Sequence, residues 1–271
     1  TPQSAGYLGV RYAPLATRDS PQFGKPFGVR GISLSGGLTV EQFEERQRLL
    51  DQVDTAFREL EAKSSLVDGL DRFDEQAYAV ISSPRAREAF DTSREPGAIA
   101  QRFGEHRFGQ SCLLAVRLIE AGVRFTTVSF SGWDTHSNNF NACRENLLPA
   151  LDAGLAALFT TLEERGLLES TTVLVTGEFG RTPKINPRAG RDHWPRAFSV
   201  LLAGGGVRGG QVLGASDANG MGPADEPITP EQIATSFYHS LGIDSQKEYH
   251  TASGRPVMIV RSGTVIPGLF G

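Results

Sequence analysis

The sequence predicts an α/β fold with a metal site at one edge of its sheet. Two apolar runs rich in β-branched residues, 123–130 and 171–177, are separated by one amphipathic helical stretch over about 146–165. A strand, a helix and a second strand at this spacing form a βαβ unit, whose strands are parallel neighbours. Each run leads into a loop that carries acidic and histidine side chains. Because ligands bind beyond the carboxyl ends of parallel strands, we expect the functional residues there.

Length, charge and composition exclude several classes of protein. The 271 residues suffice for one large α/β domain, or for one domain with a helical subdomain. The net charge of -4 and the lack of a long Lys/Arg run argue against nucleic acid as the main partner. No apolar run reaches the ~18 residues that a membrane span needs. The chain starts at Thr1 without a charged-then-apolar leader, so we expect a removed leader or an internal fragment.

Three regions follow one another along the chain. Residues 1–38 are rich in Gly, Pro and Ser and lack sustained periodicity, which predicts an irregular segment. Thr39 and Gln42 form a capping-box pattern, and Ser83-Pro84 opens a later helix. With a further helical pattern over 68–82, residues 39–105 are predicted to form a helical subdomain or insertion. The remainder, 106–271, is the predicted α/β domain with the metal site.

Hydrophobic periodicity and turn residues place the elements of the last region. Helices are expected over about 107–121, 146–165 and 229–241. Further strands are expected over 198–203 and 256–260. Gly122 and Gly166 end the first two helices, and Pro149 is tolerated only in a first turn. Gly204-Gly-Gly206-Val-Arg-Gly209 matches G-x-G-x-x-G, but a strand-like segment follows it, so we interpret it as a glycine-rich turn.

Side chains at the predicted sheet edge are of the types that bind divalent metals. They are Asp134, His136, Glu178, Asp192 and His193. Asp134 and His136 are two residues apart, so in an extended chain both point the same way. Mixed oxygen and nitrogen ligands suit Zn, Mn or Fe, with Ca or Mg as alternatives. A single pair is more often a capping Asp or a hydrogen-bonded His, but five such residues at one edge favour a metal site in which some ligands orient the others.

Three cationic residues share the loop after the second run. They are Arg181, Lys184 and Arg191. A guanidinium fork is the usual partner of phosphate or sulfate oxygens, so Arg181 and Arg191 are the expected catalytic residues that hold an anionic substrate. The alternative, in which these side chains neutralise the acidic ligands or are simply solvated, stays open.

Four stretches of the chain resemble the domain of unknown function 1501 family. They are Gly132-Trp-Asp-Thr-His136, Gly177-Glu-Phe-Gly-Arg-Thr-Pro183, Gly190-Arg-Asp-His-Trp194 and Gly254-Arg-Pro256. Members of that family are usually longer at the N-terminus and often start with a twin-arginine export signal, which implies an exported, periplasmic or cell-envelope protein. The family looks like a distant branch of the alkaline phosphatase and sulfatase superfamily. That resemblance implies a three-layer αβα fold with a mainly parallel sheet, N-terminally incomplete here.

The superfamily's two-metal pattern can be compared with this chain residue by residue. Asp134 and His136 resemble its strand-ending Asp and the His that follows, and His193 resembles a later ligand. Glu178-Phe179-Gly180 resembles its Asp-His-Gly, with Glu in place of Asp and Phe in place of a metal-binding His. The resemblance therefore implies one retained metal site and one altered site. The superfamily's Ser, Thr or Cys nucleophile normally lies N-terminal to everything present here.

The expected function is that of a metal-dependent hydrolase domain acting on phosphate or sulfate esters. Its substrate would be a small anionic ester or a sulfated or phosphorylated glycan. One alternative is a non-catalytic, metal-stabilised binding or scaffold relative, motivated by Phe179 and by the lack of an assignable nucleophile. Another is a different metallohydrolase that uses water as its nucleophile and needs no N-terminal residue.

Overall fold

The computed structural model describes residues 12–17, 19–25, 83–251 and 253–271, together with residues 27, 29, 42, 45 and 48. The predicted helices over 39–82 and most of 1–38 lie outside the described residues, although Gln42, Glu45 and Arg48 are helical and exposed. The chain divides into two compact units. Unit 1 comprises residues 1–129 and 153–157, and unit 2 comprises residues 130–152 and 158–271. The division into 1–38, 39–105 and 106–271 stays a prediction.

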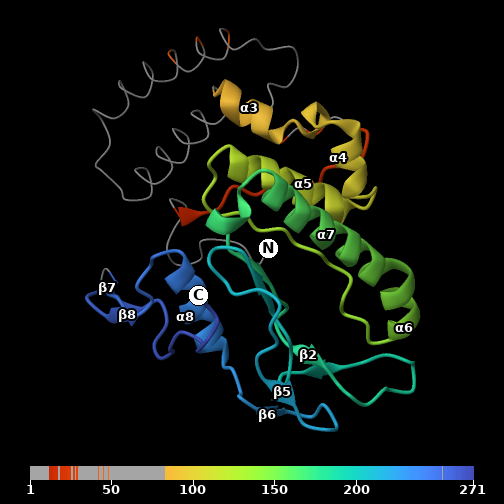
Figure 1. Ribbon diagram of the computed structural model, residues 1–271, viewed down its shortest axis with the longest axis vertical. Coiled ribbons are helices and arrows are strands. Elements are labelled where there is room, and N and C mark those ends of the chain that lie inside the picture. Colours follow the sequence, from red (N-terminus) through yellow and green to blue (C-terminus); the bar gives the residue numbers. More distant parts are fainter. Residues whose placement is uncertain are drawn as a thin grey trace, which may run out of the picture. The chain divides into compact units, whose positions relative to one another are not determined.

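The regular elements in the described part of unit 1 are helices. Its elements are α3 (Pro84–Phe90), η3 (Thr92–Arg94), α4 (Gly97–Arg102) and α5 (Arg107–Glu120) (Figure 1). Ser83 caps α3 by accepting an amide of the first turn at 3.2 Å, which confirms the predicted helix start. The predicted end of α5 is also confirmed. Gly122 has a φ of 93°, and the N–H of Val123 donates to the carbonyl of Leu118 at 2.9 Å in a Schellman motif.

The core of unit 1 forms where α3 packs on α5. Its buried cluster consists of Val29, Ala89, Phe90, Leu114 and Leu118. Beside it, Arg117 and Glu95 form an ion pair whose side chains are 12% and 5% exposed. Arg117 Nε also donates to the carbonyl of Ala89 at 3.1 Å. Because buried charges are stable only when they are paired and hydrogen bonded, this network fixes α3 and the segment after it on α5.

Residues 139–164 form one continuous helical segment. It comprises α6 (Asn139–Ala142), the π-helical turn η4 (Cys143–Leu147) and α7 (Leu148–Glu164). The sequence predicts a helix from about residue 146 with Pro149 in its first turn, and α7 confirms this, because it starts at Leu148 with Pro149 in the first turn. The sequence does not predict that α6 and η4 precede α7 without a break. Proline has no N–H and its ring crowds the carbonyl four residues earlier, so the widened π-turn directly before Pro149 lets the helix run past it.

The strands of unit 2 form two-stranded sheets, and every pair among the described residues is antiparallel. The pairs are β1 (Val173–Val175) with β4 (Leu201–Ala203), β2 (Gly180–Arg181) with β3 (His193–Trp194), β5 (Ala215–Ser216) with β6 (Pro223–Asp225), and β7 (Glu248–His250) with β8 (Pro256–Met258). Together with the helices, these pairs make the chain a mixed α/β protein.

The parallel sheet that the sequence predicts is not observed in the part of the chain that the structure describes. Exposure alternates from Phe125 to Phe130 as it would along a strand, but residues 123–130 join no ladder there. The other predicted strands shrink to three residues each. A ladder requires a partner for the backbone N–H and C=O groups. For β1 that partner is β4, which returns in the opposite direction and places Leu174 opposite Leu202.

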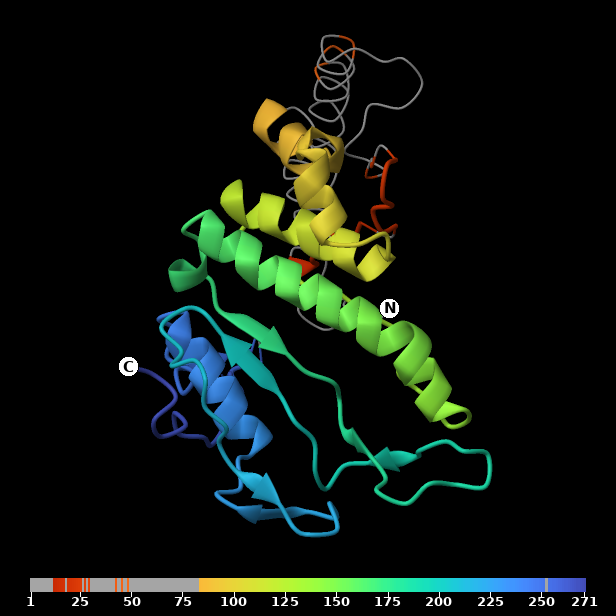
Figure 2. The ribbon, with the colours of Figure 1, turned by 45° about the vertical axis from the view of Figure 1, so that its right-hand side comes forward.

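Helix α8 (Pro230–Ser240) lies beside the β1–β4 pair (Figure 2). Its start is the predicted one, because Thr229 and Gln232 form a reciprocal capping box. At its other end, Ser240 Oγ lies 2.9 Å from the Oγ1 atom of Thr172, the residue directly before β1.

The turn at 204–206 has φ values of 66°, 56° and 81°, which confirms the interpretation as a glycine-rich turn. No helix of the described residues has both the length and the apolarity to cross a bilayer.

Candidate metal centre

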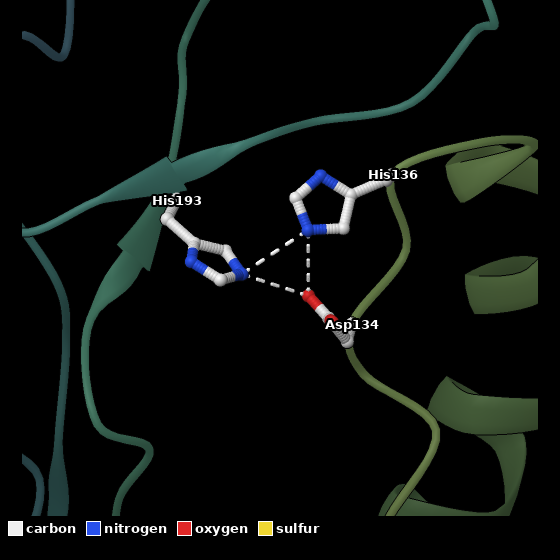
Figure 3. Close-up of side chains that lie close together, drawn as sticks. All are labelled: Asp134, His136 and His193. Atoms are coloured by element: carbon white, nitrogen blue, oxygen red, sulfur yellow. Dashed lines mark hydrogen bonds and ion pairs between the residues drawn. The ribbon is translucent and has the colours of Figure 1, made fainter.

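Three donor atoms converge in unit 2 (Figure 3). Asp134 Oδ1 lies 2.9 Å from His136 Nε2 and 2.9 Å from His193 Nε2, and the two Nε2 atoms are 3.1 Å apart. Asp134 and His136 belong to the loop before α6, whereas His193 belongs to β3. The three side chains are 66%, 35% and 50% exposed, respectively. The group is therefore open to solvent.

The loop before α6 directs both of its donors to one side. Asp134 and His136 alternate with Thr135, which is buried and donates its hydroxyl to Asn139 Oδ1. Gly132 enters this loop with a φ of 104°, in the region that favours glycine. The alternation of side chains along an extended segment thus places a carboxylate and an imidazole next to each other.

Asp192 orients the ring of His136 from behind. Its Oδ1 lies 2.6 Å from His136 Nδ1. When Nδ1 carries the proton, Nε2 presents its lone pair to the other two donor atoms. Asn186 supports the pair, because its Nδ2 donates to the His136 carbonyl at 3.0 Å and to Asp192 Oδ1 at 3.2 Å. A carboxylate behind an imidazole is the usual outer-shell partner of a metal-binding histidine.

The loop 182–192 is fastened to the loop before α6 through the backbone. The N–H of Arg191 donates to the carbonyl of Thr135 at 3.1 Å. Gly190 is buried directly beside this contact, and a Cβ at Gly190 would overlap the carbonyl group of His136. The two loops therefore approach each other at a distance that only glycine permits.

Arg181 brings a positive charge to the same carboxylate. Its Nη2 lies 2.7 Å from Asp134 Oδ1. Arg181 of β2 is directly opposite His193 of β3, so both side chains stand on one face of the ribbon. Phe179 packs against the His193 ring with centroids 4.5 Å apart, and the guanidinium carbon of Arg181 lies 6.0 Å from the Phe179 ring centroid.

Both carboxylates of the site are held in the charged form. The hydrogen bond with His193, followed by that with Arg181, lowers the pKa of Asp134 to about 2. The hydrogen bond with His136 lowers the pKa of Asp192. At neutral pH Asp134 is therefore an anionic donor, and Asp192 is an anion behind the His136 imidazole.

Comparison with protein families matches residues 1–270 to the family described as "Protein of unknown function (DUF1501)". The chain belongs to the DUF1501 family. The match includes every residue of the candidate site. Searches of the curated proteins and of the solved structures find no match.

The donor set of this DUF1501 chain fits a divalent metal ion. Tetrahedral coordination at about 2.0–2.1 Å places ligand atoms about 3.3 Å apart, so the observed separations of 2.9, 2.9 and 3.1 Å would have to open by roughly 0.2–0.4 Å. One carboxylate oxygen and two imidazole nitrogens suit Zn, Mn or Fe. When His136 is protonated at Nδ1, its Nε2 lone pair faces the lone pairs of Asp134 Oδ1 and His193 Nε2. These lone pairs repel one another, and a proton or a cation between them removes the repulsion.

The structure brings together only part of the residues that the sequence singles out. Those that meet are Asp134, His136, Arg181, Asp192 and His193. Glu178 is exposed and is not a member of the three-donor group. Arg191 donates from Nη1 to the carbonyl of Thr182 at 2.9 Å, and its guanidinium carbon lies 5.5 Å from the Phe140 ring centroid. The side chain of Arg191 therefore stabilises the loop 182–192, to which Arg191 belongs.

Sequence reasoning missed Asn186, and it named Gly190 only as part of a family motif. Asn186 precedes Pro187, and its Oδ1 accepts the N–H groups of Arg188 and Gly190 at 3.0 Å each. An Asn before Pro is a turn signal, so the sequence indicates a turn at this point. It does not indicate that the amide group of this turn reaches the backbone of His136, which lies 50 residues earlier.

Proposed function

We propose that this DUF1501 chain is a metal-dependent hydrolase domain that acts on phosphate or sulfate esters. The observation that carries the proposal is the convergence of Asp134, His136 and His193 with a guanidinium on the same carboxylate oxygen. Three donors alone would also suit a structural metal. The addition of Arg181 favours a site that takes an anion, because a guanidinium fork matches two oxygens of a phosphate or sulfate group.

The protein's own residues have distinct parts in this proposal. Asp134, His136 and His193 would hold the metal ion, which supplies Lewis-acid polarisation of the ester oxygen when bound. Asp192 fixes the His136 ring through the 2.6 Å contact. The exposure of Asp134 and His193 leaves an open coordination position, as catalytic sites require and closed structural sites do not. Arg181 orients the anionic group of the ester.

We also infer that the chain is a branch of the alkaline phosphatase and sulfatase superfamily, exported to the periplasm or cell envelope. What supports this is the order of the ligand-bearing stretches, with Asp134 and His136 first, Glu178-Phe179-Gly180 next and His193 last. The superfamily fold would add a mainly parallel sheet in three αβα layers. An experimental structure of the protein tests this, because β1 would then have a parallel neighbour. A sheet without parallel pairs would refute the assignment.

Elemental analysis of the purified chain tests the metal site directly. We expect about one transition-metal ion per chain, which Asp134→Ala and His193→Ala abolish. His250→Ala is the matched control, because this exposed histidine of β7 contacts Glu248 at 3.2 Å. Hydrolysis of p-nitrophenyl phosphate and p-nitrophenyl sulfate is measured on the same metal-loaded samples. Hydrolysis that survives in Asp134→Ala would refute a metal-dependent hydrolase.

The position of Phe179 favours a second candidate function, a non-catalytic metal-stabilised binding or scaffold domain. The ring packs on His193 where the superfamily resemblance places a metal-binding His. In addition, Thr135, which lies between the two loop donors in the sequence, donates its hydroxyl to Asn139 Oδ1. This candidate predicts metal binding without turnover of any ester in a broad phosphate and sulfate panel. Turnover that disappears on mutation of a donor would exclude it.

A further inference from the structure

One oxygen atom in the candidate metal centre has two kinds of partner. Asp134 Oδ1 faces the two imidazole nitrogens at 2.9 Å each, and it also accepts Nη2 of Arg181 at 2.7 Å. The Arg181 side chain is only 22% exposed, whereas that of Asp134 is 66% exposed, so the guanidinium is partly shielded from water and the carboxylate is open to an incoming ion. Without a metal ion, Arg181 therefore supplies the positive charge at the oxygen that a metal ion would use.

A divalent ion and this guanidinium compete for the carboxylate. An ion bound to Asp134 Oδ1 at about 2.0–2.2 Å would lie within roughly 5 Å of the Arg181 nitrogen on the same oxygen. Like charges at this separation repel each other, most strongly where water is partly excluded. The ion also withdraws charge from the oxygen that accepts the hydrogen bond. Metal binding therefore weakens the ion pair between Arg181 and Asp134.

The fold keeps Arg181 at the site when this ion pair breaks. Its backbone is paired with His193 across the β2–β3 ribbon. Its guanidinium carbon lies 6.0 Å from the Phe179 ring centroid, and its Nη1 donates to the carbonyl of Arg191 at 3.5 Å. A guanidinium released from Asp134 consequently presents free donors beside the metal position, where the oxygens of an anion can replace the carboxylate.

We propose that Arg181 is a metal-gated anion-binding residue. It pairs with Asp134 in the absence of metal, and it binds the sulfate or phosphate group of the substrate after a metal ion has displaced it. The inference rests on the metal site of the proposed function, but it does not depend on turnover. Because coupling between two ligands is reciprocal, metal and oxyanion must tighten each other by the same factor, typically about 5- to 150-fold.

Calorimetric titrations with zinc chloride and with sodium sulfate test whether metal binding makes Arg181 available to an anion. For the wild type, sulfate should bind at least about tenfold tighter to the zinc-loaded protein than to the zinc-free protein. Arg181→Ala should bind zinc tighter than the wild type in the absence of sulfate, because a competing cation is gone. The same variant should bind sulfate more weakly in the zinc-loaded form. General loss of structure would weaken the binding of both zinc and sulfate. Tighter zinc binding together with weaker sulfate binding therefore distinguishes the proposed role of Arg181 from misfolding.

Arg208→Ala is the matched control, because Arg208 is an exposed cation of the same unit whose backbone N–H donates to the carbonyl of Leu269 at 2.8 Å. Both of its affinities should stay within about twofold of the wild type. Weaker zinc binding by Arg181→Ala would overturn the gate, because Arg181 would then support Asp134 in the loaded site. Equal sulfate affinity with and without zinc, or undiminished coupling in Arg181→Ala, would also overturn it. In each of these results the wild type still binds zinc, whereas a wild type that binds no zinc rejects the proposed function as well.

Discussion

Replacing Gly190 by alanine should disrupt the candidate metal centre without altering any donor. Gly190 is buried, and an added Cβ would overlap the His136 carbonyl group and lie 2.5 Å from the amide nitrogen of Ser137. Favourable contacts of a carbon atom begin at about 3.5 Å. The two backbone segments must therefore separate by about 1 Å at Ser137 to accept the methyl group.

A displacement of this size is large for a metal-binding side chain. Such groups must be held within about 0.5 Å of their productive geometry. The shift would also stretch the contacts that hold His136, which are 2.6 Å to Asp192 and 3.0 Å to Asn186. Loss of outer-shell support typically lowers metal affinity by about 10- to 100-fold. Because Gly190→Ala moves both the ligand and its support, we expect a loss near the upper end, about 100-fold.

Competition with a chromogenic chelator measures the zinc affinity of the variant. Gly209→Ala is the matched control, because a Cβ at Gly209 meets no heavy atom within 4 Å and should leave zinc binding unchanged. Circular dichroism melting establishes that both variants fold. A folded Gly190→Ala protein that binds zinc as tightly as the wild type would show that the position of His136 does not depend on this close approach.

Further predictions concern groups in and away from the site. Asp192→Asn should weaken zinc binding by about tenfold in the same competition assay, because it removes the charge behind a ligand imidazole. The backbone N–H of Met221, with others of the same turn, lowers the pKa of Asp217 in the folded protein. The stabilisation from Asp217 is therefore fully present above the unfolded pKa of about 3.9 and is lost as the pH falls through the lower folded pKa. The difference in melting temperature between wild type and Asp217→Asn should shrink below about pH 4, and a constant difference would contradict this. Burial raises the pKa of the Cys112 thiol to about 12, whereas Cys143 is only partly buried. Iodoacetamide at about pH 8 should therefore label Cys143 alone in the folded protein and both thiols after unfolding, as peptide mass spectrometry can show.

The ends of the helices could be predicted from the sequence. Gly122 and Gly166 terminate α5 and α7 in Schellman motifs, with amide-to-carbonyl distances of 2.8–2.9 Å. Thr229 opens α8 with a capping box, and Ser83 caps α3. Each of these features depends on residues within about one helical turn of one another, so the local sequence contains the whole interaction.

The pairing of strands could not be predicted in the same way. The run 171–177 is rich in β-branched residues, yet only Val173–Val175 joins a ladder, and its partner β4 is antiparallel. The run 123–130 is also rich in β-branched residues but joins no ladder among the described residues. Composition and alternation favour an extended chain, whereas the direction and register of a pair depend on which segment arrives beside it.

The sequence by itself determined the donor chemistry of the site, because a carboxylate and an imidazole two residues apart point to one side of an extended loop. Only the tertiary structure decided which distant groups meet them. Pairing of β2 with β3 brings His193 to within 3.1 Å of a histidine 57 residues earlier, and it selects Arg181 to contact the carboxylate. The physical reason is that alternation fixes where a side chain points along its own segment, whereas contact between segments depends on close approaches, such as Gly190 against His136, that no local pattern specifies.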